Sequence, residues 1–152
     1  MGVKGTDYAD RVERLLAAED GPAPGSAILL TTQPSIFYFT GFTGEDSWAL
    51  LGRGKTTLLT DGRFALQAEE QSPAARTLIR RGDMVDCLAE HLRGGRHRSV
   101  AFLREEVTVD LLGRLRGKTR PVRWVAVSRA AIFRQRQVKS ADEVRRTERA
   151  VR

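Results

Sequence analysis

Residues 48–60 read Trp-Ala-Leu-Leu-Gly-Arg-Gly-Lys-Thr-Thr-Leu-Leu-Thr, and this stretch decides the kind of sheet that the chain forms. Two short apolar runs, residues 48–51 and 56–60, flank a Gly-Arg-Gly-Lys turn, which is the pattern of a β-hairpin. The turn superficially resembles a phosphate-binding loop, but that loop needs glycine where Ala49 stands and a helix directly afterwards. We therefore predict two antiparallel strands here and no nucleotide site.

The segments before the hairpin predict a buried strand, an ambiguous element and a loop. Residues 27–31 (Ala-Ile-Leu-Leu-Thr) form an apolar run of strand length, typical of a strand that is covered on both faces. The aromatic content of residues 33–40 permits a strand, whereas Pro34 is suited to the first turn of a short helix. Two glycines make residues 41–47 a flexible loop.

Helices and strands alternate through the rest of the chain. An amphipathic helix is predicted at residues 7–20, with Thr6 or Asp7 as its cap. Further strands are predicted at residues 76–80, 99–103 and 121–127. Further helices are predicted at residues 64–71, 84–93, 108–115, around 132–133, and at 140–152. This alternation indicates an α/β fold of three layers (α/β/α), with a mixed, roughly six-stranded sheet that is mostly parallel and includes one hairpin.

The charge of the chain is unevenly distributed. The net charge is +7, but residues 1–92 hold 9 basic and 13 acidic side chains, whereas residues 93–152 hold 17 basic and 6 acidic ones. A basic half can mark a nucleic-acid surface. However, 22 of the 26 basic residues are arginine, which suggests a compositional bias of the whole proteome. A solvated basic face is therefore favoured and no nucleic-acid partner is expected, with a polyanion site as the alternative.

Length and composition exclude several classes of protein. The 152 residues suit one domain with a hydrophobic core. The single cysteine, Cys87, excludes an intramolecular disulfide. No apolar run reaches about 18 residues, so no membrane-spanning helix is predicted, and the N-terminus lacks the apolar centre of a signal peptide. We expect a cytoplasmic protein without a membrane partner.

Few polar residues form a pattern with chemical meaning. His91 follows Cys87 by four residues on one predicted helix, but zinc would need further ligands, and His97 is the only other histidine. A structural role for both residues is therefore favoured. Asp61 follows a predicted strand, as a carboxylate of a two-metal nuclease would, but the other carboxylates fall on helix surfaces or caps.

The loop at residues 41–47 combines glycines with aromatic and acidic side chains. Phe42 and Trp48 are compatible with core packing and equally with a binding role, because glycine-rich loops often carry binding groups. Glu45 and Asp46 would be presented to a partner by the same loop.

Two motifs around this loop and the hairpin resemble those of a known family. They are Ser35-Ile-Phe-Tyr-Phe-Thr-Gly-Phe42 and Leu59-Thr-Asp-Gly-Arg-Phe64, the second followed by Gln67-Ala68. With Arg136-Gln-Val-Lys-Ser-Ala-Asp-Glu-Val144, they make the chain similar, over nearly its whole length, to the N-terminal domain of the creatinase, prolidase and aminopeptidase P family. The chain departs from the family pattern at Gln33-Pro34-Ser35, where an asparagine is usual, and at Phe64, where tyrosine is commoner.

The resemblance implies a division of the chain. Residues 1–136 would form the creatinase/prolidase N-terminal-like domain, and residues 137–152 the junction and first helix of an absent C-terminal metallopeptidase domain. In the family that second domain binds two Mn, Co or Zn ions and cleaves an Xaa-Pro bond. We therefore expect no catalytic residue and no metal ligand in this chain. We also expect the helix after Ser140 to fray or to pair with another chain, because its packing partner is missing.

The resemblance also implies roles for individual residues. Phe42, Glu45 and Asp46 become candidates for the substrate cleft. Arg63 is a further candidate, since its guanidinium would pair with a peptide carboxylate, although a salt bridge to Asp61 is favoured. The domain would shape the cleft for proline-containing peptides, pack on its own C-terminal domain and mediate a homodimer. The parent would be an Xaa-Pro aminopeptidase or dipeptidase. The alternative is a non-catalytic protein- or peptide-binding module of the same fold.

Overall fold

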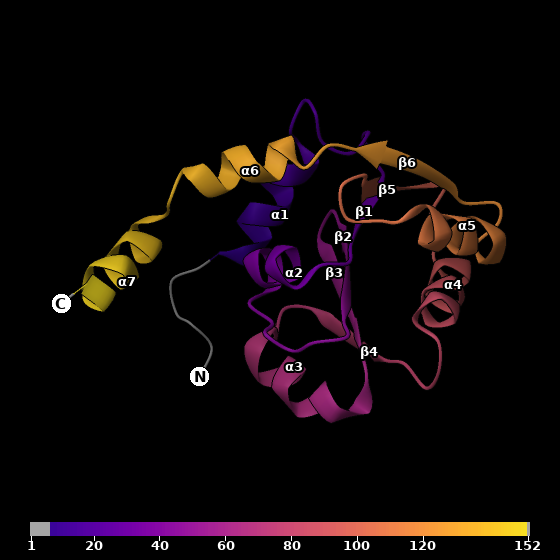
Figure 1. The fold of residues 1–152 in the computed structure, drawn as a ribbon, viewed down its shortest axis with the longest axis horizontal. Coiled ribbons are helices and arrows are strands. Elements are labelled where there is room, and N and C mark those ends of the chain that lie inside the picture. The colour runs from indigo at the N-terminus through magenta and orange to yellow at the C-terminus, as the bar shows by residue number, and fades with distance from the viewer. Residues whose placement is uncertain (1–6, 152) are drawn as a thin grey trace.

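The computed structural model describes residues 7–151 and contains a six-stranded sheet between two layers of helices (Figure 1). The strands are β1 (Ala27–Leu30), β2 (Trp48–Gly52), β3 (Lys55–Thr60), β4 (Arg76–Ile79), β5 (Ser99–Leu103) and β6 (Arg123–Val127). The helices are α1 (Tyr8–Leu16), α2 (Gln33–Thr40), the 3₁₀ turn η1 (Gly62–Phe64), α3 (Ala65–Gln71), α4 (Met84–Gly94), α5 (Val109–Lys118), α6 (Ala130–Gln137) and α7 (Ala141–Val151). Among residues 7–151, no helix is both long and apolar enough to cross a membrane.

The sheet has the order β4-β3-β2-β1-β5-β6. Strand β2 runs antiparallel to both β1 and β3, whereas the other three pairs are parallel. The predicted hairpin is therefore confirmed, and its turn includes Gly54 at φ 66°, a backbone conformation that glycine adopts readily. The predicted three-layer α/β/α fold with a mixed sheet is also confirmed.

Two hydrophobic clusters fill the space on either side of the sheet. Ile28 and Leu30 of β1 point to the face that α1, α2, α3 and α6 cover, whereas Ala27 and Leu29 point to the face under α4 and α5. Figure 1 shows these two helix layers on opposite sides of the strands. All four side chains are at most 3% exposed, which explains why β1 is an unbroken apolar run.

The ambiguous segment at residues 33–40 is a helix, α2, with Pro34 in its first turn. It packs Ile36 and Phe39 against the sheet. The helix ends at Gly41, whose φ of 77° is that of a typical helix-ending glycine. A Cβ atom on Gly41 would lie 2.6 Å from the Tyr8 hydroxyl, so both the backbone angle and the space call for glycine.

Helix α1 is shorter than the sequence predicts. Asp7 caps it as expected, accepting a hydrogen bond from the Asp10 amide at 3.0 Å, but the helix ends at Leu16 instead of Asp20. The carboxylate of Asp20 pairs with Arg134 of α6, so the last predicted turn is replaced by a contact between distant segments. The other predicted cap, Thr6, lies outside the described residues.

Candidate functional site

Several of the polar residues named above lie at one end of the sheet, at the edge formed by the carboxyl ends of β1, β3 and β4. Strand β2 runs antiparallel to its neighbours, so its first residue lies beside the carboxyl ends of β1 and β3. Loop 41–47 arrives here before β2, Asp61 follows β3, and Arg80 follows β4. In open α/β sheets, ligands bind at the carboxyl ends of the strands. A ligand-binding site is therefore expected at this edge.

Loop 41–47 is fastened to the end of β3 by Ser47. The Ser47 hydroxyl donates to the Glu45 carbonyl oxygen at 2.7 Å, and its Oγ lies 2.8 Å from Oγ1 of the buried Thr60. Between them, Asp46 has a φ of 48°, a left-handed backbone conformation that aspartate tolerates better than most residues. Because the loop is tied down at Ser47, the exposed side chains of Glu45 and Asp46 stand at a defined position.

Phe42 does not face a cleft in this structure. Its side chain is fully buried, and it meets the Phe64 ring edge-on at 6.2 Å. A Cβ atom on Gly44 would lie 2.3 Å from the Phe42 ring, so the loop folds directly over that ring. The prediction of Phe42 as a cleft-facing residue is thus corrected. Burying this apolar ring stabilises the fold more than exposing it beside polar groups would. The buried ring also supports loop 41–47, which packs over it.

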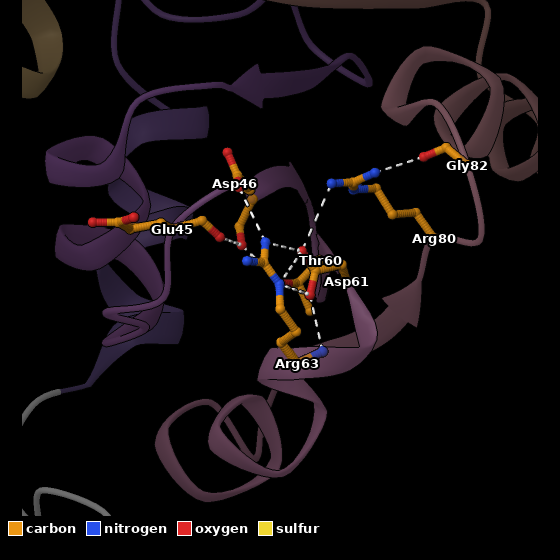
Figure 2. Close-up of polar contacts among 8 residues, drawn as sticks. Glu45, Asp46, Thr60, Asp61, Arg63, Arg80 and Gly82 are labelled. Carbon is orange, nitrogen blue, oxygen red and sulfur yellow. Dashed lines mark hydrogen bonds and ion pairs between the residues drawn. The ribbon is translucent and has the colours of Figure 1, made fainter.

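Asp46, Asp61, Arg63 and Arg80, which we call the charged edge, form a chain of alternating charge (Figure 2). Asp61 Oδ2 accepts from Arg63 Nη2 at 2.7 Å, and Oδ1 accepts from the Arg63 backbone amide at 2.9 Å. The same Nη2 lies 3.2 Å from Asp46 Oδ2, and Arg80 Nη2 lies 3.7 Å from Asp61 Oδ2. The favoured alternative for Arg63, a salt bridge to Asp61, is therefore present, and Asp46 joins it.

Asp61 and Arg63 keep each other ionised. The hydrogen bond from the Arg63 side chain, with the charges of Arg63 and Arg80, lowers the pKa of Asp61 to about 2. The hydrogen bond to Asp61 correspondingly raises the pKa of Arg63. The arrangement thus offers fixed charges for recognition, and neither group is suited to proton transfer near neutral pH.

A pocket of about 380 Å³ opens beside the charged edge. Its walls combine acidic residues (Glu45, Asp46 and Asp83) with Arg80, and Trp48 forms part of the lining. Two buried atoms in this lining, Thr31 Oγ1 and Arg80 Nε, have no hydrogen-bond partner among the described residues. Buried polar groups are usually satisfied, so a ligand that accepts from Arg80 would complete the site.

The structure therefore brings together only some of the predicted residues. Asp46 and Arg63 are in contact, whereas Figure 2 shows the Glu45 carboxylate turned away from the arginines. Trp48 combines both interpretations, since its half-buried ring packs on the core and also lines the pocket. Arg80 was not singled out, although its place at the carboxyl end of a predicted strand was a signal that could have found it.

Cys87 and His91 lie on α4 and are not part of the charged edge. Burial raises the pKa of the Cys87 thiol and lowers the pKa of His91, so the thiol is protonated and the imidazole neutral at pH 7. The His91 ring is 6.3 Å from that of His97, and the part of the chain that the structure describes has no group of three or more His, Cys, Asp or Glu residues able to hold a metal ion.

Known proteins share this fold and sequence pattern. Residues 11–138 match the family model of the Creatinase/Prolidase N-terminal domain. Aminopeptidase P2 of Arabidopsis thaliana is 44% identical over 46 residues, which cover 30% of this chain and 6% of that protein. The matched region is thus a small part of this curated relative.

Two solved structures have similar folds. The X-Pro aminopeptidase from Thermotoga maritima MSB8 superposes with a TM-score of 0.77 at 25% identity, over 90% of this chain and 38% of that one. The N-terminal domain of the cytoplasmic peptidase PepQ from Mycobacterium tuberculosis H37Rv gives a TM-score of 0.68 at 26% identity, over 83% of this chain and 96% of that one. The family model covers most of the sequence, and the chain accordingly belongs to the Creatinase/Prolidase N-terminal domain family.

Proposed function

We propose that the chain is the non-catalytic N-terminal part of a metal-dependent Xaa-Pro peptidase, and that its charged edge borders the substrate cleft. The family membership supports this proposal, as do the X-Pro aminopeptidase and the peptidase among its structural neighbours. Residues 137–152 would then be the junction to a C-terminal catalytic domain. The observation that carries the proposed role is the charged edge itself, next to the pocket at the carboxyl ends of the strands.

The catalytic metal would be held by that second domain. The carboxylates of the charged edge do not fit a metal centre, because Asp61 already accepts from Arg63 and lies near Arg80. A divalent cation such as Mn, Co or Zn placed there would be repelled by two guanidinium groups. We therefore derive no metal chemistry from this chain.

The charged edge is suited to recognition of an anionic group. Arg63 uses Nε and Nη2 for its contacts with Asp61 and Asp46, and among residues 7–151 no contact engages Nη1. A peptide carboxylate would meet a guanidinium whose plane is already fixed, which favours a well-defined hydrogen bond. The carboxylate of Glu45, which is exposed on loop 41–47, would favour a positively charged group of a peptide.

Three further parts of the proposal concern partners and location. We propose a homodimer in which this domain contributes to the interface, proline-containing peptides as ligands of the cleft, and a cytoplasmic location. The basic second half of the sequence would lie partly at an interface with the catalytic domain or the second subunit. Family membership supports these parts of the proposal.

The experiment compares the isolated chain with the protein that contains the catalytic domain. The chain with Mn²⁺, Co²⁺ or Zn²⁺ should hydrolyse no Xaa-Pro dipeptide. In the longer protein, Arg63→Lys keeps the charge but loses the planar fork, so KM should rise by about tenfold while kcat changes little.

Arg53→Lys is the matched control, since Arg53 is an exposed arginine at the hairpin turn whose ion pair with Glu13 is 3.7 Å long. It should leave KM unchanged. Metal-dependent turnover by the isolated chain would contradict the non-catalytic role. Equal KM values for the Arg63→Lys and Arg53→Lys proteins would remove the charged edge from substrate recognition. Peptide binding without turnover by the longer protein would favour the binding-module alternative.

A further inference from the structure

A buried arginine links helices that are far apart in the sequence. Arg11 of α1 is only 6% exposed. Its Nη1 donates to the Tyr38 carbonyl oxygen of α2 at 2.7 Å, and its Nη2 lies 3.0 Å from Glu143 Oε1 of α7. The guanidinium also stacks 4.1 Å from the centre of the Tyr38 ring. The buried positive charge is thus compensated from two other helices, as a buried charge must be.

The Glu143 side chain also caps the first turn of α7. Its Oε2 accepts from the Ser140 backbone amide at 2.8 Å, and Ser140 Oγ accepts from the Glu143 amide at 3.2 Å. These two bonds are a capping box, which satisfies amides that the first helical turn leaves free. One carboxylate therefore starts α7 with one oxygen and ties it to α1 with the other.

Helix α6 reinforces the same junction. Gln135 Nε2 donates to the Arg11 carbonyl oxygen at 2.9 Å, and the Tyr38 hydroxyl donates to the Gln135 carbonyl oxygen at 3.3 Å. The segment of residues 138–140, between α6 and α7, is therefore held on both sides.

Among residues 7–151, helix α7 makes few other contacts with the body of the domain. It spans eleven residues, and isolated helices of that length are marginal in water. Asp142 is its only buried residue, whereas Val144 and Val151 are exposed. Figure 1 shows α7 projecting away from the body of the domain. Its position thus depends on polar contacts at its first turn and not on a packed apolar face.

We propose that Arg11 is a positioning residue that sets the direction of α7, so that the chain leaves the domain as a rigid arm. The Arg11 contact on Tyr38 lies one turn before Gly41, where loop 41–47 of the candidate site begins. The same guanidinium thus joins the arm to the helix that carries the site loop. That the arm orients a catalytic domain rests on the function proposed above; the direction of α7 does not.

The test measures distances in the chain of 152 residues by pulsed electron paramagnetic resonance. Spin labels are placed at Glu148→Cys on α7 and Glu69→Cys on α3, both exposed positions, in a Cys87→Ala background. We expect one narrow distance distribution. Glu143→Gln should broaden it about twofold or more, because the single amide oxygen cannot serve both the Ser140 amide and Arg11. The urea midpoint of the body should fall as well, because the variant leaves the buried Arg11 charge without its anionic partner, while circular dichroism should show that the body remains folded.

Arg145→Gln is the matched control, since it removes an exposed arginine of α7 whose pair with Asp142 is 3.5 Å long and leaves the capping box, Glu143 and Arg11 in place. It should keep the distribution narrow. A broad distribution in the parent chain, or an unchanged one in Glu143→Gln, would overturn the proposal. A distance that vanishes on dilution with unlabelled chain would overturn it as well, since α7 would then pair with a second copy. No peptide or metal enters the measurement, so its failure is distinct from a failure of the proposed peptidase role.

Discussion

The molecule contains two arginine–carboxylate clusters in opposite environments. At the charged edge, the Arg63 side chain is 68% exposed, and its partners are Asp61, two residues earlier, and Asp46 of loop 41–47. At the contact of Arg11 with Tyr38 and Glu143, which we call the Arg11 junction, the Arg11 side chain is 8% exposed, and its partners come from α2 and α7. The same pair of residue types therefore lies in two opposite environments, and we propose recognition for the exposed cluster and architecture for the buried one.

The two clusters should differ in how much they stabilise the fold, because one is exposed to water and the other is buried. Exposed ion pairs contribute about 0–1 kcal/mol, because water screens the charges and long side chains lose freedom. Breaking a buried pair leaves an uncompensated charge and costs about 3–5 kcal/mol. Substitutions at the charged edge should thus alter binding with little effect on stability. Substitutions of Phe42, which lies beneath the site loop, or of Arg11 should lower the free energy of unfolding.

Phe42→Ala should lower the free energy of unfolding by about 3–5 kcal/mol, because it leaves a cavity under the site loop. Phe37→Ala is the control on the neighbouring helix, since the Phe37 side chain is 46% exposed, and it should cost about 1 kcal/mol or less. Urea denaturation followed by circular dichroism measures both. Equal losses for the two variants would show that the loop over Phe42 does not depend on the core.

Arg11→Met should lower the free energy of unfolding by about 2–4 kcal/mol, somewhat less than for a fully buried pair, because Glu143 is partly exposed. Arg14→Met removes an exposed arginine of the same helix that pairs with Asp10 four residues earlier, and should change stability by about 0.5 kcal/mol or less. The same urea titration separates them. A difference below about 1 kcal/mol would remove the contrast between the two clusters.

Gly41 connects the two regions, because it ends the helix that Arg11 contacts and begins the site loop. Gly41→Ala should cost about 1–2 kcal/mol, since alanine resists a φ of 77° and its Cβ would approach the Tyr8 hydroxyl to 2.6 Å. Gly82→Ala is the control, because no atom lies within 4 Å of the added Cβ. Thermal unfolding compares the two variants, and equal midpoints would show that the helix end adapts without strain.

Local patterns in the sequence were enough for much of the fold. Strand Ser99–Leu103 was predicted with the bounds it has, because a short apolar run between polar turns has the length of a covered strand. Helix α4 begins at Met84 as predicted, after Asp83, which caps it by accepting from the amides of Val85 and Asp86. The end of α1 was misplaced because Asp20 pairs with Arg134, a contact across the fold that no local pattern encodes.

The candidate site was less predictable for the same reason. The Asp61–Arg63 pair lies within one motif, so local spacing reveals it. The burial of Phe42 depends on Phe64, and the position of Arg80 beside Asp61 depends on β4 pairing with β3. The role of Arg11 was missed entirely, because its acceptors lie on α2 and α7. Only the folded chain brings such groups together.

The smallest predicted effect concerns pH at the charged edge. The folded pKa of Asp61 is lowered to about 2, chiefly by the hydrogen bond from Arg63, whereas the usual value is 3.8. Ionised Asp61 therefore stabilises the fold above the unfolded pKa, and this contribution is lost as the pH falls through about 2. Carboxyl carbon NMR shifts should show Asp61 ionised at pH 3, and Arg63→Gln should move its titration back toward 3.8.

Because the pKa of Asp61 is lowered only in the folded state, the Arg63→Gln protein should have a lower urea midpoint than the parent at pH 7, but only slightly, since water screens this pair. A shifted titration with a small loss of stability would show that the charged edge contributes little to folding. A large loss of stability would mean instead that the charged edge, like the Arg11 junction, holds the fold together, and the contrast between the two clusters would fail.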